Sequence, residues 1–227
     1  MSDGTTATTP RTYRGPDVSL PMRAAILVTE EGREEARVLW HQVFVDEQRW
    51  AFRSDNPIDL RVETTVDGRS RLHDMYDDEA TYIGVRRGSV LVAAHRLSLP
   101  IGGVFHLEKY LAPQGLKLPE RFKSARTAEM TRLAVARSAR KTRALFLLLR
   151  CEFEWLRTEG FTYCFTTAQF PQPGQLYVDL GMLREPMPEF RFDPEDSLPV
   201  SLLSGEPPTA HESRLWAMTE PMRERAA

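Results

Sequence analysis

The sequence lacks several features that would point directly to a function. It contains only two cysteines, Cys151 and Cys164, and both fall in predicted core segments, so neither a disulfide framework nor a zinc site is expected. The five histidines are scattered without metal-ligand spacing, so we predict no bound metal. No apolar run approaches the roughly 18 residues of a transmembrane segment, and the polar N-terminus has no signal-peptide core. A cytoplasmic protein is therefore expected.

Neither sign of charge dominates the sequence. The 30 Lys and Arg residues nearly balance the 32 Asp and Glu residues, which gives a formal net charge of −2. Because no basic excess is available to neutralise phosphates, a dedicated nucleic-acid binder is not expected. With 41% hydrophobic and 27% charged residues, the 227-residue chain has the composition of an ordinary folded protein.

The distribution of apolar residues predicts three parts. Residues 1–20 are rich in Thr, Pro and Gly with little to bury, which predicts a flexible N-terminal arm. Residues 21–205 carry the periodic apolar patterns and form a single predicted domain. Residues 206–227 read as a C-terminal tail, because prolines and charges interrupt every pattern there.

The stretch from Ala125 to Thr167 has the clearest pattern. Residues 126–136 alternate small or apolar with polar residues and predict a strand. Residues 139–157 place apolar groups at the spacing of one helix face, and residues 161–167 predict a buried strand rich in aromatic residues and threonine. A strand, a helix and a strand within about forty residues predict a right-handed crossover between neighbouring parallel strands.

The rest of the chain extends this unit into an α/β pattern. The further elements expected are a strand at 22–28, a helix capped by Thr29 and running to about residue 47, a long loop at 48–70, a hairpin of strands at 80–85 and 89–97, a helical turn at 107–111, a helix at 173–180 and a strand-like segment ending near 192. The order β-α-β-β-β-α-β-α-β predicts one α/β domain whose mixed central sheet is flanked by helices.

A short basic turn joins the predicted strand and helix of the crossover unit. It reads Arg137-Ser-Ala-Arg140-Lys141-Thr-Arg143 and precedes a helix N-terminus, where free N–H groups and the macrodipole favour an anion. It suits a pyrophosphate or a phosphopantetheine phosphate, and a solvated basic helix start is the open alternative. It lacks the glycines of a P-loop or a dinucleotide fingerprint.

Three separate blocks carry a family resemblance. The blocks are Phe44 with Trp50; Asp74, Asp77 and Arg96; and Glu129 with Arg132. In this order, over roughly residues 36–181, they resemble the acyl-homoserine-lactone synthases, a group within the GNAT acyltransferase superfamily. The resemblance implies a GNAT-like fold. It also implies an enzyme that moves an acyl group, a fatty one in that group of enzymes, from an acyl-CoA or acyl carrier protein thioester to an amine.

Two positions depart from the motifs of the autoinducer synthases. Trp40 stands where an arginine is expected, although Arg37 lies one helical turn earlier, and Leu72 stands where an acidic residue is expected. These departures favour the wider group that includes N-acyl amino acid synthases, which acylate a small-molecule or peptide amine.

Glu129 is the candidate general base for deprotonating that amine. It lies in mid-strand among small residues, where burying a carboxylate is costly without a purpose. Backbone N–H groups near Leu133 and Val135 are placed to stabilise the carbonyl oxygen as it gains negative charge. The alternative is a structural ion pair of Glu129 with Arg132 or Arg96. Because Glu129 and Arg132 point to opposite faces of a flat strand, both can reach one site only across a β-bulge.

The other candidate residues each have a functional and a structural interpretation. Asp74 and Asp77 either hold the ammonium group of the acceptor or brace Arg96 and Arg132. Phe44 and Trp50 either cover an acyl chain or fill the core. An acetyl-CoA-dependent N-acetyltransferase and a catalytically silent GNAT-like binding module remain alternative functions. The sequence does not specify acyl length, the donor carrier, the acceptor or the oligomeric state.

Overall fold

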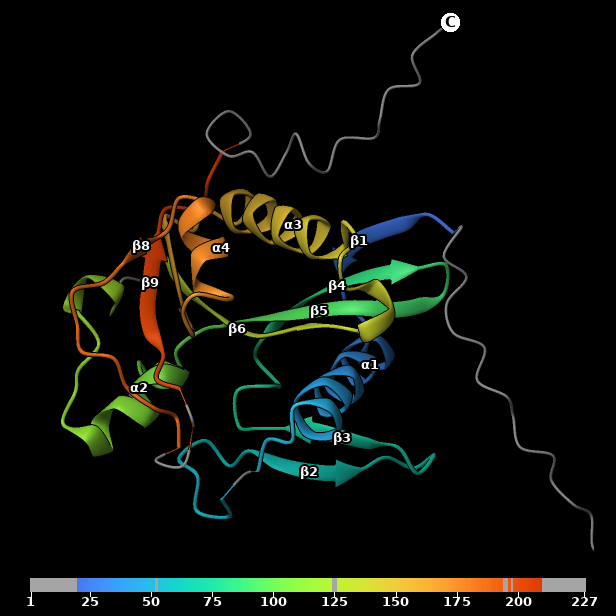
Figure 1. Cartoon of the computed structure of the whole chain (residues 1–227), viewed down its shortest axis with the longest axis horizontal. Coiled ribbons are helices and arrows are strands. Elements are labelled where there is room, and N and C mark those ends of the chain that lie inside the picture. Colours follow the sequence, from blue (N-terminus) through green and yellow to red (C-terminus); the bar gives the residue numbers. More distant parts are fainter. Residues whose placement is uncertain (1–19, 52, 124–125, 194–195, 197, 210–227) are drawn as a thin grey trace, which may run out of the picture.

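The structure is a computed structural model that describes residues 20–51, 53–123, 126–193, 196 and 198–209. Within these residues the centre is a seven-stranded sheet with strand order β1-β4-β5-β6-β7-β9-β8 (Figure 1). Its strands are β1 (Met22–Ile26), β4 (Thr81–Arg87), β5 (Val90–Ser98), β6 (Thr127–Val135), β7 (Tyr163–Ala168), β8 (Leu183–Arg184) and β9 (Ser201–Gly205). The α-helices are α1 (Glu30–Trp40), α2 (His106–Leu111), α3 (Ala144–Thr158) and α4 (Gly174–Asp179).

The crossover unit predicted from the sequence lies in this sheet. β6 and β7 pair in parallel and are connected through α3, whereas the other strand pairs of the sheet are antiparallel. β4 and β5 form the predicted hairpin, whose turn contains Gly88 at a φ of 59°, a conformation that glycine adopts without strain. The predicted mixed sheet flanked by helices is therefore confirmed.

The helices cover both faces of the sheet (Figure 1). α3 lies on one face, where its buried residues, among them Leu148 and Phe153, pack on the sheet in the largest apolar cluster. α1 lies on the opposite face, where Leu39 and Trp40 pack against Tyr82 of β4. The described residues thus form two apolar layers on either side of one sheet.

α1 begins and ends close to the predicted positions. Thr29 is its N-cap, because the Thr29 hydroxyl accepts a hydrogen bond from the Gly32 amide at 3.2 Å. Beyond Trp40 the helix continues as η1 (His41–Glu47), a π-helix. The predicted extent to residue 47 is therefore confirmed, with a wider helical pitch over the last seven residues.

α3 begins later than predicted, at Ala144 rather than at residue 139. Residues Arg137–Ala139 form a 3₁₀ turn, η4, and Lys141 then takes a left-handed conformation with a φ of 62°. The Thr142 hydroxyl donates to the Ala139 carbonyl and accepts from the Ala144 amide, so it replaces helical hydrogen bonds with local ones. The basic turn is therefore a separate segment before the helix.

The prediction of a structureless loop at 48–70 was wrong in its second half. β2 (Arg61–Thr64) and β3 (Ser70–His73) form a separate antiparallel pair beneath α1 (Figure 1). Its strands lack the alternation that identifies a half-buried strand. Ion pairs hold it instead: Arg71 contacts Glu63 at 2.7 Å and also Glu34 of α1.

The strand β9 was also missed, because Pro199 and Pro207 flank it in the sequence. All five of its residues are buried, since it lies between β7 and β8. The predicted arm and tail fall mainly on residues 1–19 and 210–227, outside the described residues, so these domain boundaries remain predictions. No helix in the described part of the chain is long and apolar enough to cross a bilayer.

Truncating the α3 core should destabilise the fold measurably. Leu148 is completely buried, so Leu148→Ala should lower the free energy of unfolding by about 2–5 kcal/mol through lost burial and a residual cavity. Leu183→Ala is the matched control, because Leu183 is 70% exposed and should change stability by less than about 0.5 kcal/mol. Urea unfolding of both variants measures the difference, and equal stabilities would contradict this packing.

Candidate active site

A buried ion cluster lies on the α1 face of the sheet. Arg96 of β5 donates from Nη1 to Asp74 Oδ1 at 2.8 Å and to Asp77 Oδ1 at 2.5 Å, and all three side chains are inaccessible to solvent. The Tyr82 hydroxyl donates to Asp77 at 2.8 Å, and the Tyr76 amide donates to Asp74 at 2.8 Å. Each carboxylate is therefore already occupied by protein donors, which favours the bracing role over the ammonium-binding role.

Arg132 joins this cluster because β6 contains a β-bulge. Ala94 pairs with Ala134 and Arg96 with Thr131, so two residues of β6 oppose one residue of β5. Arg132 takes a left-handed φ of 57° at the bulge, and its Nη2 donates to Asp74 Oδ2. The sequence required such a bulge for Glu129 and Arg132 to share a face, and the structure contains it.

The centre of the cluster pairs two arginines with two aspartates, and Arg37 Nε lies 4.0 Å from Asp77 Oδ2 at its margin. Burial alone would raise the pKa of Asp74, but the guanidinium groups of Arg132 and Arg96 outweigh it and hold the pKa well below its usual value. Asp77 behaves similarly: burial raises its pKa, Arg96 lowers it, and the net shift is downward. Both aspartates are therefore ionised acceptors and poor bases.

Glu129 lies beside this cluster and makes a contact that the sequence did not predict. Its Oε1 is 3.0 Å from Nδ1 of His106, and its Oε2 accepts from the Leu107 amide at 3.2 Å. His106 is the first residue of α2, so the carboxylate joins mid-strand β6 to the start of that helix. The structure contains no ion pair of Glu129 with Arg96 or Arg132 among the described residues, so the alternative expected from the sequence was wrong about the partner.

Aromatic rings surround His106. Its ring centroid is 5.6 Å from that of Tyr76, 5.4 Å from that of Tyr110 and 6.4 Å from that of Phe192. Burial raises the pKa of Tyr76, and the nearby carboxylate of Glu129 raises it further; burial also raises the pKa of Tyr110. Both phenols are therefore neutral hydrogen-bonding groups near neutral pH.

Phe44 and Trp50 stack on each other at the end of η1. Their ring centroids are 4.6 Å apart with an interplanar angle of 13°, and Phe44 is buried whereas Trp50 is 48% exposed. A half-exposed tryptophan stacked on a buried ring places an aromatic pair between the core and the surface, where an apolar group can pack on it. Trp40 is fully buried instead, and the Arg132 guanidinium lies 5.7 Å from its ring centroid.

The strand β6 has a free edge beyond its paired segment. Pairing with β7 runs only from Thr127 to Met130, although β6 continues to Val135. The Ala136 amide donates to Val92 of β5, so by strand alternation the amides of Leu133 and Val135 point toward the opposite edge. No described strand pairs with that edge, and Arg140 Nε donates to the Val135 carbonyl there at 3.1 Å.

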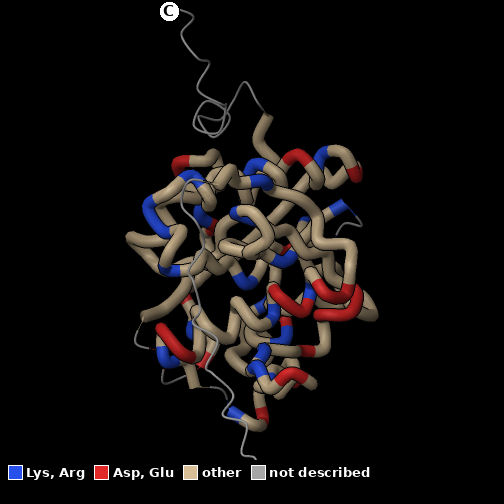
Figure 2. Tube along the Cα trace, turned by 90° about the vertical axis from the view of Figure 1, so that its right-hand side faces the viewer, with Lys and Arg blue, Asp and Glu red and all other residues tan. Residues whose placement is uncertain are grey.

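The four basic residues of the turn, Arg137, Arg140, Lys141 and Arg143, are all exposed. Arg140 also contacts Glu47 of η1, and the other three make no ion pair with any described residue. Positive and negative segments are otherwise interspersed along the trace (Figure 2), so any attraction of an anion here is local rather than a field of the whole molecule.

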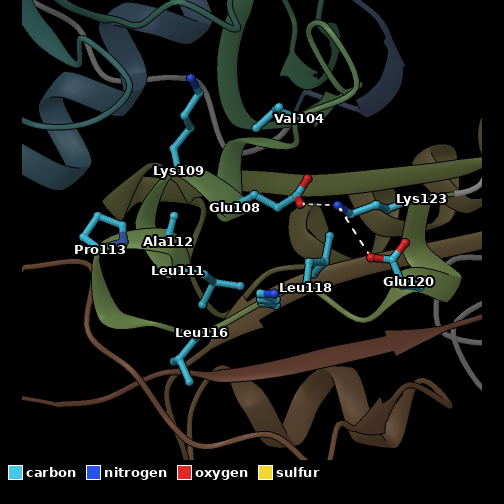
Figure 3. Close-up of a pocket in the computed structure, with 11 residues that line it drawn as sticks. Val104, Glu108, Lys109, Leu111, Ala112, Pro113, Leu116, Leu118, Glu120 and Lys123 are labelled. Carbon is cyan, nitrogen blue, oxygen red and sulfur yellow. Dashed lines mark ion pairs between the residues drawn. The ribbon is translucent and has the colours of Figure 1, made fainter.

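A cavity of about 510 Å³ lies along α2 (Figure 3). Its apolar walls include Leu111, Leu116 and Leu118. Lys123 forms ion pairs with Glu108 at 3.0 Å and Glu120 at 3.9 Å. None of the site residues predicted from the sequence lines this cavity. α2 therefore contributes His106 to the charged site and other side chains to the cavity.

Neither cysteine belongs to the site. Both are free thiols, Cys164 buried and Cys151 partly buried, and no group of three or more His, Cys, Asp or Glu side chains among the described residues is arranged to hold a metal ion. The candidate site residue that sequence reasoning missed is His106, which lies 23 positions from Glu129 in the chain.

Comparisons with known proteins identify the fold. No protein-family model matches the sequence, and no curated protein matches it. The AHL synthase LasI is similar in structure, with a TM-score of 0.59 and 14% sequence identity over 90% of this chain and 99% of LasI. FeeM, an N-acyl amino acid synthase from uncultured soil microbes, has a TM-score of 0.55 and 17% identity over 88% of this chain and 99% of FeeM.

A third similar structure contains ligands. BjaI, a CoA-dependent acyl-homoserine lactone synthase solved with SAM and isopentyl-CoA, has a TM-score of 0.58 and 20% identity over 82% of each chain. At these identities the similarity establishes the fold. The group of proteins that the sequence motifs resemble is thus also a group whose solved structures share this architecture.

Removing Asp74 should weaken the fold and reduce its sensitivity to acid. The folded protein keeps Asp74 and Asp77 ionised, whereas the unfolded chain protonates them below about pH 4, so acid should lower the free energy of unfolding as the pH falls from about 5. Asp74→Asn should lower the stability at pH 7 by about 3–5 kcal/mol, because two buried arginines lose a partner. It should also flatten the acid dependence.

Urea unfolding between pH 7 and pH 3 measures both effects. Asp78→Asn is the matched control. The Asp78 side chain is 85% exposed, and its ion pair with Arg37 is long, at 4.0 Å. If Asp74→Asn resembles this control in stability and in acid dependence, the electrostatic description of the cluster is wrong.

Proposed function

We propose that this protein is an N-acyltransferase that moves an acyl group, a fatty one, from a CoA or carrier-protein thioester to the amine of an amino acid or peptide. One observation carries the proposal. On a single face of the sheet, the Glu129–His106 pair and the Arg132–Asp74 pair lie next to each other on β6, close to where that strand leaves β7. A cytoplasmic location belongs to the same proposal.

Amide formation from a thioester requires a deprotonated amine and a polarised carbonyl. A carboxylate or imidazole within hydrogen-bonding reach of the amine removes its proton as the nitrogen attacks. Glu129 and His106 supply both kinds of group in one hydrogen-bonded pair. Negative charge then develops on the carbonyl oxygen, and backbone N–H groups fixed in the sheet stabilise it without reorganising.

The free edge of β6 supports an extended thioester arm as the donor. The amides of Leu133 and Val135 face that edge, and an extended ligand chain can hydrogen-bond to them as an added strand would. The Arg140 side chain donates a hydrogen bond to the Val135 carbonyl in this structure, so we expect the bound thioester to displace that side chain. The thioester carbonyl would then lie near the bulge at Arg132.

The basic turn and the start of α3 support a phosphate on that arm. The amides of Leu145 and Phe146 at the first turn of α3 donate to no described residue, and Arg137, Lys141 and Arg143 are exposed beside them. Unpaired amides and arginines together are the usual environment of a bound phosphate. The same residues also suit the acidic surface of a carrier protein.

The acyl chain and the acceptor are assigned by position and chemistry. The stacked Phe44 and Trp50 pair would cover the acyl chain, since Phe44 is buried and the Trp50 side chain next to it is 48% exposed. Arg132 retains a buried Nε without a partner among the described residues, which suits an acceptor that carries a carboxylate. An N-acyl amino acid product fits these residues and the departures at Trp40 and Leu72.

Two alternatives remain as outcomes of one experiment. An acetyl-CoA-dependent N-acetyltransferase would use the same base and the same β6 edge with a shorter acyl group. A GNAT-like binding module would bind a thioester without turning it over. The buried Glu129–His106 pair favours an enzyme, because such a pair is costly to bury without a catalytic or structural return.

Incubating the purified protein with a panel of thioesters should give N-acyl products. The donors are acetyl-CoA, long-chain acyl-CoA and long-chain acyl carrier protein, each offered with a mixture of amino acids and small peptides. We expect an N-fatty-acyl product and one free thiol per amide formed, detected by mass spectrometry and a thiol reagent. Acetylation alone would establish the first alternative, and binding without a product would establish the second.

Charge reversal at the basic turn should weaken donor binding. Arg137→Glu combined with Arg143→Glu should raise KM for the thioester about tenfold or more with little change in kcat, because a hydrogen bond to a charged group is worth about 1.5–3 kcal/mol. Arg157→Glu, an exposed arginine at the opposite end of α3, is the control and should leave KM unchanged. An unchanged KM in the double variant would remove the turn from the donor site.

A further inference from the structure

We infer that His106, rather than Glu129, is the group that takes the proton from the attacking amine, and that Glu129 is its positioning residue. This inference rests on the proposed N-acyltransferase function and identifies which atom of the site performs the proton transfer. It starts from the hydrogen bonds that the two side chains already make.

Both carboxylate oxygens of Glu129 accept hydrogen bonds from the protein. Oε1 contacts His106 Nδ1 at 3.0 Å, and Oε2 accepts from the Leu107 amide at 3.2 Å. These two donors lie at the start of α2, so the carboxylate holds the helix against β6. If Glu129 took a proton from the substrate, it would lose its charge, and its hydrogen bonds to both donors would weaken from charge-assisted to neutral ones.

The opposite nitrogen of the imidazole is placed differently. An ionised carboxylate can only accept hydrogen bonds, so in the neutral imidazole Nδ1 carries the proton toward Glu129 and Nε2 carries the lone pair. Nε2 makes no hydrogen bond with any residue in the described part of the chain. The His106 side chain keeps 10% of its surface exposed, compared with 4% for Glu129. The accessible acceptor of the pair is therefore the imidazole nitrogen.

The ring is also held in a fixed orientation. Tyr76 lies edge-on to it, and Tyr110 and Phe192 contact it from other sides. Tyr76 is itself held, because its hydroxyl donates to the Val104 carbonyl at 3.1 Å and its amide donates to Asp74. A carboxylate on one nitrogen and packed rings around the carbons give an oriented base, the same logic that positions the histidine of a hydrolase triad.

The other acid–base groups nearby are unsuited to this step. Asp74 and Asp77 have depressed pKa values because their arginine partners outweigh the effect of burial, and the pKa values of Tyr76 and Tyr110 are raised by burial. An aspartate that is hard to protonate and a phenol that is hard to ionise are both poor bases near neutral pH. Glu129 and His106 remain, and the geometry favours His106.

The proton transfer balances without a further reactant. The amine nitrogen forms a bond to the thioester carbonyl carbon while His106 Nε2 takes one proton from that nitrogen, and the carbonyl π electrons move to oxygen. When the carbonyl re-forms, the carbon–sulfur bond breaks, and the leaving sulfur takes the proton back from Nε2. The products are one amide and one thiol, and His106 returns to its neutral form.

Substituting His106 with asparagine separates the two nitrogens of the ring. In His106→Asn the side-chain amide can still donate to Glu129 from about the position of Nδ1, but no group replaces Nε2. We expect kcat to fall by about 10²–10⁴-fold, the usual contribution of a general base, with a smaller change in KM and an unchanged thermal midpoint. If Glu129 were the base, this variant would keep most of its kcat.

Chemical rescue distinguishes a base from a packing residue. His106→Ala opens a space beside Glu129, and added imidazole should restore part of the lost kcat in a concentration-dependent manner. Imidazole should not rescue Glu129→Gln, which retains its own imidazole. His41→Ala is the control, because His41 contacts only Asp46, at 3.5 Å, among the described charged residues and should keep full activity.

The results separate this inference from the function on which it rests. A wild-type protein that transfers no acyl group from any thioester overturns both. Full wild-type transfer with more than about half of kcat retained in His106→Asn overturns the assignment of the base alone. A His106→Ala variant that is folded, inactive and insensitive to imidazole also overturns it, because a purely structural role would behave in that way.

Discussion

The candidate site depends on the neutralisation of one buried charge. Arg96 is completely buried, and its guanidinium group forms ion pairs with Asp74 and Asp77. Burying one guanidinium group without a partner would cost too much free energy. Two carboxylates against that one guanidinium group would leave an excess of negative charge. Arg132 restores the balance by contacting Asp74 from β6. The four side chains come from β5, β6 and the loop before β4, so their mutual attraction ties that loop to the two strands. Glu129 and His106 lie against this fixed frame.

The bulge in β6 converts that frame into a site. Thr131 bonds to Arg96 on the α1 face, and the extra residue keeps Arg132 on the same face, where it lies over Trp40. After the bulge, Ala134 packs in the α1 layer, while Leu133 and Val135 pack toward α3. In a regular strand, Arg132 would point to the face opposite Glu129 and Thr131. The one inserted residue therefore places all three side chains on the same face. The bulge lies where the pairing of β6 with β7 ends. The side chains of Glu129, Thr131 and Arg132 are therefore next to the unpaired edge of β6.

Much of this architecture could be predicted from the sequence, because local patterns determine it. The crossover unit, the β4–β5 hairpin and the Thr29 cap rest on periodicity and turn chemistry, and the need for a bulge followed from the spacing of Glu129 and Arg132. The β2–β3 pair was missed because ion pairs rather than apolar alternation hold it. β9 was missed because flanking prolines hide a strand that is buried between two others. His106 was missed for a different reason: its partner lies in another element, and no local pattern reports a contact that only the tertiary fold creates.

The buried cluster also limits how this protein can diversify or be redesigned. Asp74, Asp77, Arg96 and Arg132 form connected ion pairs, so changing one of them leaves another buried charge without its partner. Tyr110 and Phe192 contact the imidazole from outside that unit and make no ion pair with it. Trp50 lies further from the ionic centre and has about half of its surface in solvent. A library that aims to alter substrate preference should therefore randomise these aromatic positions and leave the ionic centre untouched.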